Sequence, residues 1–223
     1  MEKRKIDMVF VIDGTGSMGP CIDKVKEAAK KFYQKFNEQM ILMGSEVTSL
    51  RIKTIVFRDY LDDGEEAMVE SPFFELPIDL ADFEASLAAI HATGGGDIPE
   101  NGLEALHFAF SSDFTATGLR DRQVIVLFTD ADALAIGERN AAPGYPAGMV
   151  DETGLISEWI MPTQTSKLSR GKRLVIYAPN DSKYKELSSK LPGSNFVPVE
   201  LSTGLVEFDF DDIIKIIAAS ASN

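Results

Sequence analysis

Side chains that carry oxygen atoms gather in three short loops of the sequence. Residues 13–17 read Asp-Gly-Thr-Gly-Ser, which places one carboxylate and two hydroxyl groups at alternate positions. Residues 94–100 contain Asp97, and residues 128–132 contain Asp130. The glycines of the first loop allow its backbone to bend so that the three oxygen-bearing side chains converge.

Such a set of ligands suits a hard divalent cation. Magnesium prefers oxygen ligands in near-octahedral geometry and keeps several waters, so it needs few protein groups. His91, His107 and Cys21 lack the paired spacing that is typical of zinc sites. We therefore expect Mg²⁺, with Mn²⁺ and Ca²⁺ as alternatives that accept the same oxygen ligands.

The same residues have an interpretation without a metal. Ser17 could cap the following helix in a bare strand-to-helix turn, and Asp97 could cap a helix that opens at Pro99. We expect Glu100 and Asp132 to be solvated or to support the ligands from behind rather than to bind the ion. Since capping and ligation are compatible, both interpretations stay open.

The apolar pattern predicts the elements that would position these loops. Continuous apolar runs at 6–12 and 123–128 are typical of strands buried on both faces. Further strands are predicted at 50–57, 67–76, 174–178 and 196–201. Helices are predicted at 21–43, 80–91, 99–110, 155–168, 182–191 and 208–221.

This alternation predicts an α/β fold built on a mostly parallel sheet. A turn at 62–64 returns the strand at 67–76 antiparallel, and Pro72 places that strand at an edge. No linker divides the chain, so we expect residues 1–223 to form one domain. Ligands of such sheets bind where the strands end, which is where two of the three loops lie.

The order Asp13-x-Thr15-x-Ser17, then Asp97, then Asp130 resembles the metal-ion-dependent adhesion site (MIDAS) of von Willebrand factor A domains. The resemblance implies a three-layer, Rossmann-like fold with one antiparallel edge strand, flanked by helices, over essentially the whole chain. It also implies that Thr15, in place of the usual serine, and Ser17 bind the ion directly. Asp13 and Asp130 would hold metal-bound waters, and Asp97 would take the middle-loop position.

Integrin-like members of that family have threonine where Asp97 stands. A third carboxylate over-neutralises a divalent ion, so capture of a partner's Asp or Glu by the ion is less favourable here. The residues Phe57-Arg58-Asp59-Tyr60 resemble the intracellular branch of the family, including A domains associated with alpha-kinases. We expect Arg58 and Asp59 at the same sheet edge as the metal. The other expected neighbours of the ligands are Gly14, Gly16, Glu100 and Asp132.

The net charge of −13 is concentrated in one segment. Residues 59–119 contain acidic side chains but no Lys or Arg, and the rest of the chain is nearly neutral. An acidic protein is repelled by DNA and by anionic membranes, so we expect neither as a partner. No stretch is long and apolar enough for a membrane span, and we expect a cytoplasmic location.

Two functions are compatible with these residues. The first is a Mg²⁺-dependent protein-binding module in an intracellular complex, and the resemblance implies an ATPase, a kinase or a phosphatase as partner. We expect the partner's face to be basic. The second is a phosphotransferase or phosphatase that resembles haloacid dehalogenases and uses Asp13 as nucleophile. We favour the binding module, because no residue pair resembles a nucleophile and its base.

Overall fold

The fold is built on a sheet of seven strands. A computed structural model describes residues 1–94, 99–162, 167–200 and 209–222. The strands are β1 (Glu2–Asp13), β2 (Ser45–Phe57), β3 (Met68–Glu70), β4 (Phe74–Leu76), β5 (Arg122–Phe128), β6 (Lys172–Pro179) and β7 (Ser194–Val199). Their order is β3-β2-β1-β5-β6-β7, and β4 also pairs with β2.

The sheet is mostly parallel, as predicted. β1, β2, β5, β6 and β7 run parallel, whereas β3 and β4 run antiparallel to β2. The predicted antiparallel edge strand is thus present as two short segments, with Pro72 between them. The central strands are buried on both faces, which explains their continuous apolar sequences.

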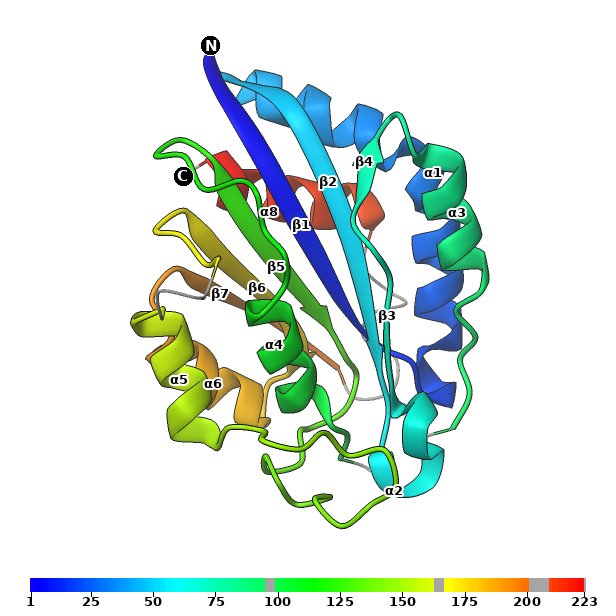
Figure 1. Ribbon diagram of the computed structural model, residues 1–223. Helices are drawn as coiled ribbons and strands as arrows, with labels where there is room; N and C mark the ends of the chain where they lie inside the picture. Colours follow the sequence, from blue (N-terminus) through cyan, green and yellow to red (C-terminus); the bar gives the residue numbers. More distant parts are fainter. Residues whose placement is uncertain (95–98, 163–166, 201–208, 223) are drawn as a thin grey trace.

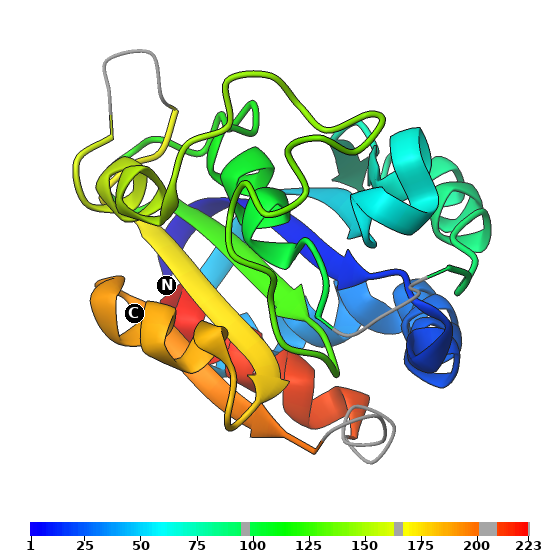
Figure 2. The ribbon, with the colours of Figure 1, turned by 90° about the horizontal axis from the view of Figure 1, so that it is seen from below.

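Helices cover both faces of the sheet and complete three layers (Figures 1 and 2). One face carries α1 (Gly19–Leu42), α3 (Leu80–Ala88) and α8 (Phe210–Ser222), and the other carries α4 (Gly102–Phe110), α5 (Glu152–Ile160) and α6 (Lys183–Lys190). The short helices η1 (Gly16–Met18), α2 (Tyr60–Asp63) and η2 (Gly64–Ala67) lie in loops at the carboxyl edge. In the part of the chain that the structure describes, every helix is too short or too polar to span a membrane.

Three predicted helices differ from the structure by three residues or more at one or both ends. The helix predicted at 80–91 is α3, which ends at Ala88. The helix predicted from Pro99 begins at Gly102, because Glu100 forms an isolated parallel bridge with Ala133 and its backbone groups are occupied there. The helix predicted at 155–168 is α5, which begins earlier and ends at Ile160. Pro162 explains this end, because a proline disfavours the helical conformation of the residue before it.

Candidate metal centre

The first oxygen-bearing loop leaves the carboxyl end of β1 beside the end of β5. In the sheet register Ile12 lies opposite Phe128, so Asp13 and the residues after β5 meet at one edge. Gly14 turns the chain in a crowded position. A Cβ atom there would lie 2.6 Å from Cγ1 of Val56, so only glycine fits without a shift.

Hydrogen bonds join four of the five predicted ligands into one cluster. Asp13 is fully buried, and its Oδ1 accepts from the backbone N–H of Thr15 at 2.9 Å and from Thr15 Oγ1 at 2.6 Å. Ser17 Oγ donates to Asp130 Oδ1 at 2.9 Å and lies 3.4 Å from Thr15 Oγ1. Ser17 is exposed, so the cluster opens to solvent on that side.

Thr129 belongs to this cluster and was missed by the sequence analysis. Its hydroxyl donates to the second oxygen of Asp13, Oδ2, at 2.7 Å. The only signal in the sequence is that Thr129 stands between a buried strand and Asp130. Its contact with Asp13 depends on the pairing of β1 with β5, which the sequence does not specify.

The pKa values of both carboxylates of the cluster are raised. Burial raises the pKa of Asp13 to about 6, against hydrogen bonds from Thr15 and Thr129 that lower it, and nearby Asp130 raises it further. Burial also raises the pKa of Asp130. Neither carboxylate forms an ion pair with another described residue. Oxygen donors with uncompensated negative charge fit a hard divalent cation.

The fifth predicted ligand, Asp97, lies outside the described residues, as do 95, 96 and 98. The residues just before them are fixed against the first loop: Thr93 N–H donates to the Gly14 carbonyl at 3.0 Å, and Gly16 N–H donates to the Gly94 carbonyl at 3.4 Å. Among described residues, no group of three or more His, Cys, Asp or Glu side chains is arranged to hold a metal.

Arg58 lies at the predicted edge and ties the loops together. Its buried guanidinium donates to the carbonyls of Gly14 at 3.1 Å, Thr93 at 2.9 Å, Glu66 at 3.0 Å and His91 at 2.8 Å. Arg58 therefore positions the first loop against the loop before Asp97. It is a donor to backbone groups and has no lone pair for a cation.

Asp59 also lies at this edge, where it fastens the long loop after Asp130. It is fully buried and receives a two-pronged ion pair from Arg139, with Nε at 2.9 Å from Oδ1 and Nη2 at 2.6 Å from Oδ2. From the same loop, Tyr145 packs edge-on against Tyr60, with ring centroids 5.1 Å apart. Both contacts fix the rim of the site; the sequence suggested Tyr145 as a rim residue but not its partner Tyr60, and it did not indicate the Asp59–Arg139 pair.

Glu100 and Asp132 support the site in different ways. Glu100 is buried rather than solvated, and its Oε2 has no hydrogen-bond partner among the described residues. Burial and the charge of Asp13 raise the pKa of Glu100 to about 8. Asp132 accepts from the backbone N–H groups of Ala133 at 2.7 Å and Lys183 at 2.8 Å, so it fixes the start of α6.

Comparison with known proteins yields one family. A family model described as a von Willebrand factor A domain matches residues 7–198. Two crystal structures of the pilus adhesin SpaC from Lactobacillus rhamnosus GG are similar, with a TM-score of 0.55 for one and 0.54 for the open conformation, both at 11% identity. They cover 98% of this chain, which spans only 31% and 30% of theirs. No curated protein matches the sequence.

Proposed function

The chain belongs to the von Willebrand factor A domain family, and from this premise we propose that it is a protein-binding module whose binding depends on a divalent cation. The proposal is carried by one observation. Asp13, Thr15, Ser17 and Asp130 form a continuous oxygen cluster that carries two carboxylates and no compensating ion pair among the described residues. A cation at this position would relieve their mutual repulsion.

Mg²⁺ is the ion that we propose, and Mn²⁺ and Ca²⁺ accept the same donors. Thr15 and Ser17 would hold it through their hydroxyl groups, with Asp13, Asp130 and, from the middle loop, Asp97. When bound, the ion supplies a Lewis-acidic positive charge at the edge of the sheet. The protein's own residues fix that edge, because Arg58 and the Asp59–Arg139 ion pair hold the surrounding loops.

The surroundings of the cluster favour a basic partner. Asp62, Glu65 and Glu66 are exposed on α2 and η2, at the same edge of the sheet. With Asp97 as a third carboxylate, the bound ion would be neutralised, so attraction of a basic face outweighs capture of a partner's carboxylate. We propose that the partner is an intracellular ATPase, kinase or phosphatase and that the complex is cytoplasmic. The resemblance of residues 57–60 to intracellular members supports this.

Affinity capture from a cell extract tests the proposed function. The baits are the unaltered chain, Asp130→Asn and Asp62→Asn, each in Mg²⁺ and in EDTA. Asp130→Asn removes a charge from the cluster and keeps an acceptor for Ser17, whereas Asp62→Asn removes an exposed charge nearby. We expect the unaltered chain and Asp62→Asn to retain the same partner in Mg²⁺ only, and Asp130→Asn to retain none. Capture that is equal in EDTA would contradict cation dependence.

The alternative of an Asp13 nucleophile has no support in the geometry. Asp13 exposes none of its surface, and both of its carboxylate oxygens accept hydrogen bonds. A nucleophile must instead reach its substrate. Incubation with acetyl phosphate and Mg²⁺ distinguishes the two functions, because a phosphorylated Asp13 would establish the enzyme and an unlabelled protein is expected for the binding module.

A further inference from the structure

Three neighbouring strands carry an arginine near their start on the same face of the sheet, at the end opposite the candidate metal centre. Arg122 lies opposite Ile6 in the register of β5 with β1, and Arg173 lies opposite Val124 in the register of β6 with β5. Arg4 precedes Ile6 by two residues, and Arg122 precedes Val124 by two. Because side chains alternate along a strand, Arg4, Arg122 and Arg173 share the face that α8 covers.

The three guanidinium groups are not equally satisfied. Arg4 donates to Ser45 Oγ at 3.2 Å, to the carbonyls of Arg120 and Ser222 at 2.9 Å each, and to Glu2 Oε2 at 2.5 Å. Among the described residues, Arg122 and Arg173 each donate one hydrogen bond, to the carbonyl of the preceding residue at 2.9 Å. Neither forms an ion pair there.

Arg122 is the anomalous member of this group. It exposes only 7% of its surface, and its Nε is a buried donor without a partner in the described part of the chain. A buried donor of a charged group that is left unpaired costs free energy, and natural structures rarely leave one. The pKa of Arg122 is lowered by burial and then by Arg4 and Arg173, and the pKa of Arg173 is lowered by burial and by Arg4.

Among the described residues, nearby carboxylates compensate these arginines only in part, because Glu2 and Asp121 oppose the lowering of the pKa of Arg122 without forming an ion pair with it. Glu2 pairs with Arg4 and, at 3.5 Å, with Arg120. The carboxylate of Asp121 accepts the backbone N–H groups of Lys5 at 3.0 Å and Gly118 at 2.9 Å. The carboxyl end of α8 supplies only about half a negative charge.

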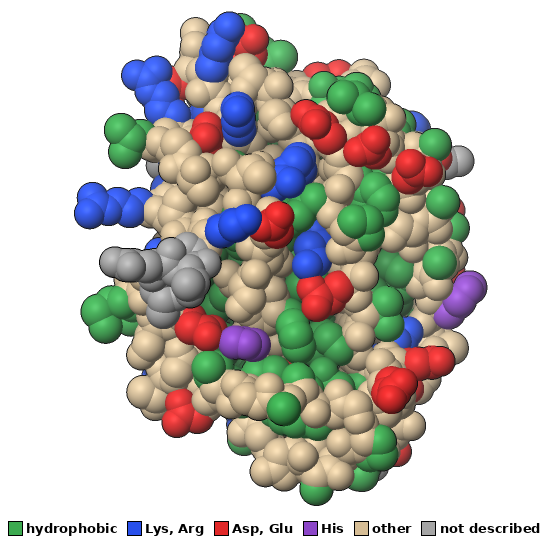
Figure 3. All heavy atoms as spheres, in the orientation of Figure 1, with side chains coloured by type: hydrophobic (Ala, Val, Ile, Leu, Met, Phe, Trp, Pro, Cys, Tyr) green, Lys and Arg blue, Asp and Glu red, His purple; other side chains and the backbone are tan. Residues whose placement is uncertain are grey.

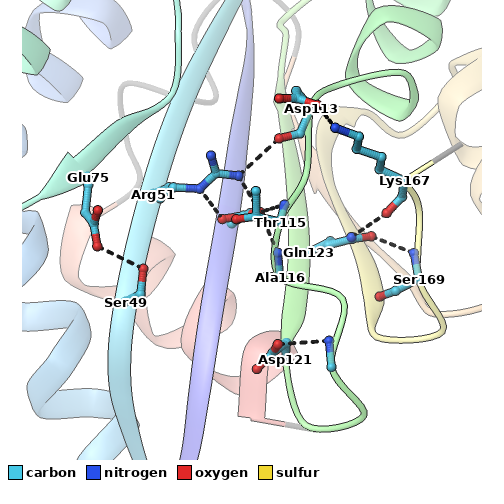
Figure 4. Close-up of polar contacts among 12 residues, drawn as sticks. Ser49, Arg51, Glu75, Asp113, Thr115, Ala116, Asp121, Gln123, Lys167 and Ser169 are labelled. Carbon is cyan, nitrogen blue, oxygen red and sulfur yellow. Dashed lines mark hydrogen bonds and ion pairs between the residues drawn. The ribbon is translucent and has the colours of Figure 1, made fainter.

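On the opposite face of the sheet, at the same end, the basic side chains of Arg51 and Lys167 are paired with acidic residues. There Arg51 donates to both carboxylate oxygens of Asp7, at 2.8 and 2.7 Å, and to the Asp113 carbonyl at 3.1 Å. Lys167 pairs with the Asp113 carboxylate (Figure 4). On the α8 face Arg4 pairs with Glu2, whereas Arg122 and Arg173 have no such acidic counterpart among the described residues.

We propose that Arg122 and Arg173, backed by Arg4, form a binding site for a phosphate group. Two guanidinium groups with free donors stand on adjacent strands, which are about 4.8 Å apart. The planar guanidinium fork matches the oxygens of phosphate, and a dianion with three free oxygens satisfies two forks at once. A carboxylate, with one charge and two oxygens, satisfies one fork. The site is separate from the metal centre and independent of the proposed function.

Calorimetric titration of the full chain with inorganic phosphate tests this site, at constant ionic strength maintained with chloride. We expect saturable binding to the unaltered chain, and binding about tenfold weaker to Arg173→Gln. Arg170→Gln is the matched control, because Arg170 is an exposed base near the same edge that lies outside the cluster. Its affinity for phosphate is expected to equal that of the unaltered chain.

The variant Arg122→Lys tests whether phosphate binding requires the planar guanidinium group, because lysine keeps the positive charge but lacks that group. If that variant fails to fold, Arg173→Gln still decides, because Arg173 is half-buried and bonds only its neighbour's carbonyl. Absence of binding to the unaltered chain would overturn the proposal. Equal binding by Arg173→Gln and Arg170→Gln would also overturn it, as would acetate binding as tightly as phosphate.

Discussion

At the scale of single residues, buried Asp and Glu side chains lie at the edge of the sheet where the parallel strands end. Glu100 has an oxygen without a partner among the residues that the structure describes, and the pKa of Asp13 is raised by burial although three donors contact it. Such groups are held for a reason other than stability, since each would be cheaper in water. The proposed cation beside Asp13 would supply that reason for the cluster.

The raised pKa of Glu100 predicts a pH dependence of stability. The folded state holds this proton up to about pH 8, whereas an unfolded glutamate releases it near its ordinary pKa of 4.5. The free energy of unfolding of the metal-free chain therefore falls as pH rises through this window, by about 2 kcal/mol between pH 6 and pH 8. Urea unfolding at several pH values measures it.

Glu100→Gln keeps the shape of the side chain and removes the titration. We expect this variant to lose the decline between pH 6 and pH 8, while Asp62→Asn, which alters an exposed acid, keeps it. Asp13, whose pKa is raised to about 6, is present in all three proteins, so its contribution cancels in the comparison. An unchanged decline in Glu100→Gln would show that another group is responsible.

At the scale of elements, Gly14 allows the loop after β1 to pack closely against the end of β2 and the segment around Thr93. Gly14 N–H donates to the Phe57 carbonyl at 2.8 Å, and the Gly14 carbonyl accepts from Thr93 N–H and from Arg58. The neighbouring glycine is different. A Cβ atom on Gly16 would have no neighbour nearer than the Gly94 carbonyl at 4.0 Å.

This difference predicts opposite outcomes for two similar substitutions. Gly14→Ala is expected to destabilise the fold by about 1–3 kcal/mol, because the new methyl group overlaps Val56. It should also weaken Mg²⁺ binding, because it displaces the loop that carries Thr15 and Ser17. Gly16→Ala is expected to change stability by less than about 0.5 kcal/mol. Thermal unfolding of both variants checks this, and equal effects would refute the crowding argument.

The sequence was informative about elements whose signals are local. Continuous apolar runs predicted β1 and β5, and the loops that follow them were therefore expected to meet. The extended pairing of Glu100 with Ala133 was not predictable, because it depends on two segments that are distant in sequence. The same holds for Arg58, whose four carbonyl partners come from three separate loops, and for the Asp59–Arg139 pair.

At the scale of the whole molecule, negative charge is concentrated in one part of the chain and distributed over several elements. The segment 59–119, which contains no Lys or Arg, includes α2, η2, β3, β4, α3 and α4. Three of its exposed acids, Asp62, Glu65 and Glu66, lie on α2 and η2, at the edge that carries the proposed cation site. Near the end of the sheet where the N-terminus lies, acidic side chains stand beside Lys and Arg (Figure 3). Charge is therefore divided unevenly, with a local excess of acids on α2 and η2.

This division predicts that partner binding depends on salt. Raising the ionic strength from low to physiological screens exposed charges, so the affinity of the captured partner is expected to fall. Combining Asp62→Asn with Glu65→Gln and Glu66→Gln should reduce that dependence, since these exposed acids lie at the proposed contact edge. Surface plasmon resonance with the immobilised partner, repeated over a series of salt concentrations, tests this dependence. An affinity that does not change with salt would contradict a charged interface.

The most direct test of the account is calorimetric titration of the metal-free chain with Mg²⁺. The account predicts one saturable site in the unaltered chain and in Asp62→Asn, and loss of that site in Ser17→Ala and Asp130→Asn. Ser17 is exposed, so its loss should leave the fold intact, which circular dichroism verifies. Absence of binding heat with millimolar Mg²⁺ or Mn²⁺, or equal binding by all four proteins, would contradict a cation site built on this oxygen cluster.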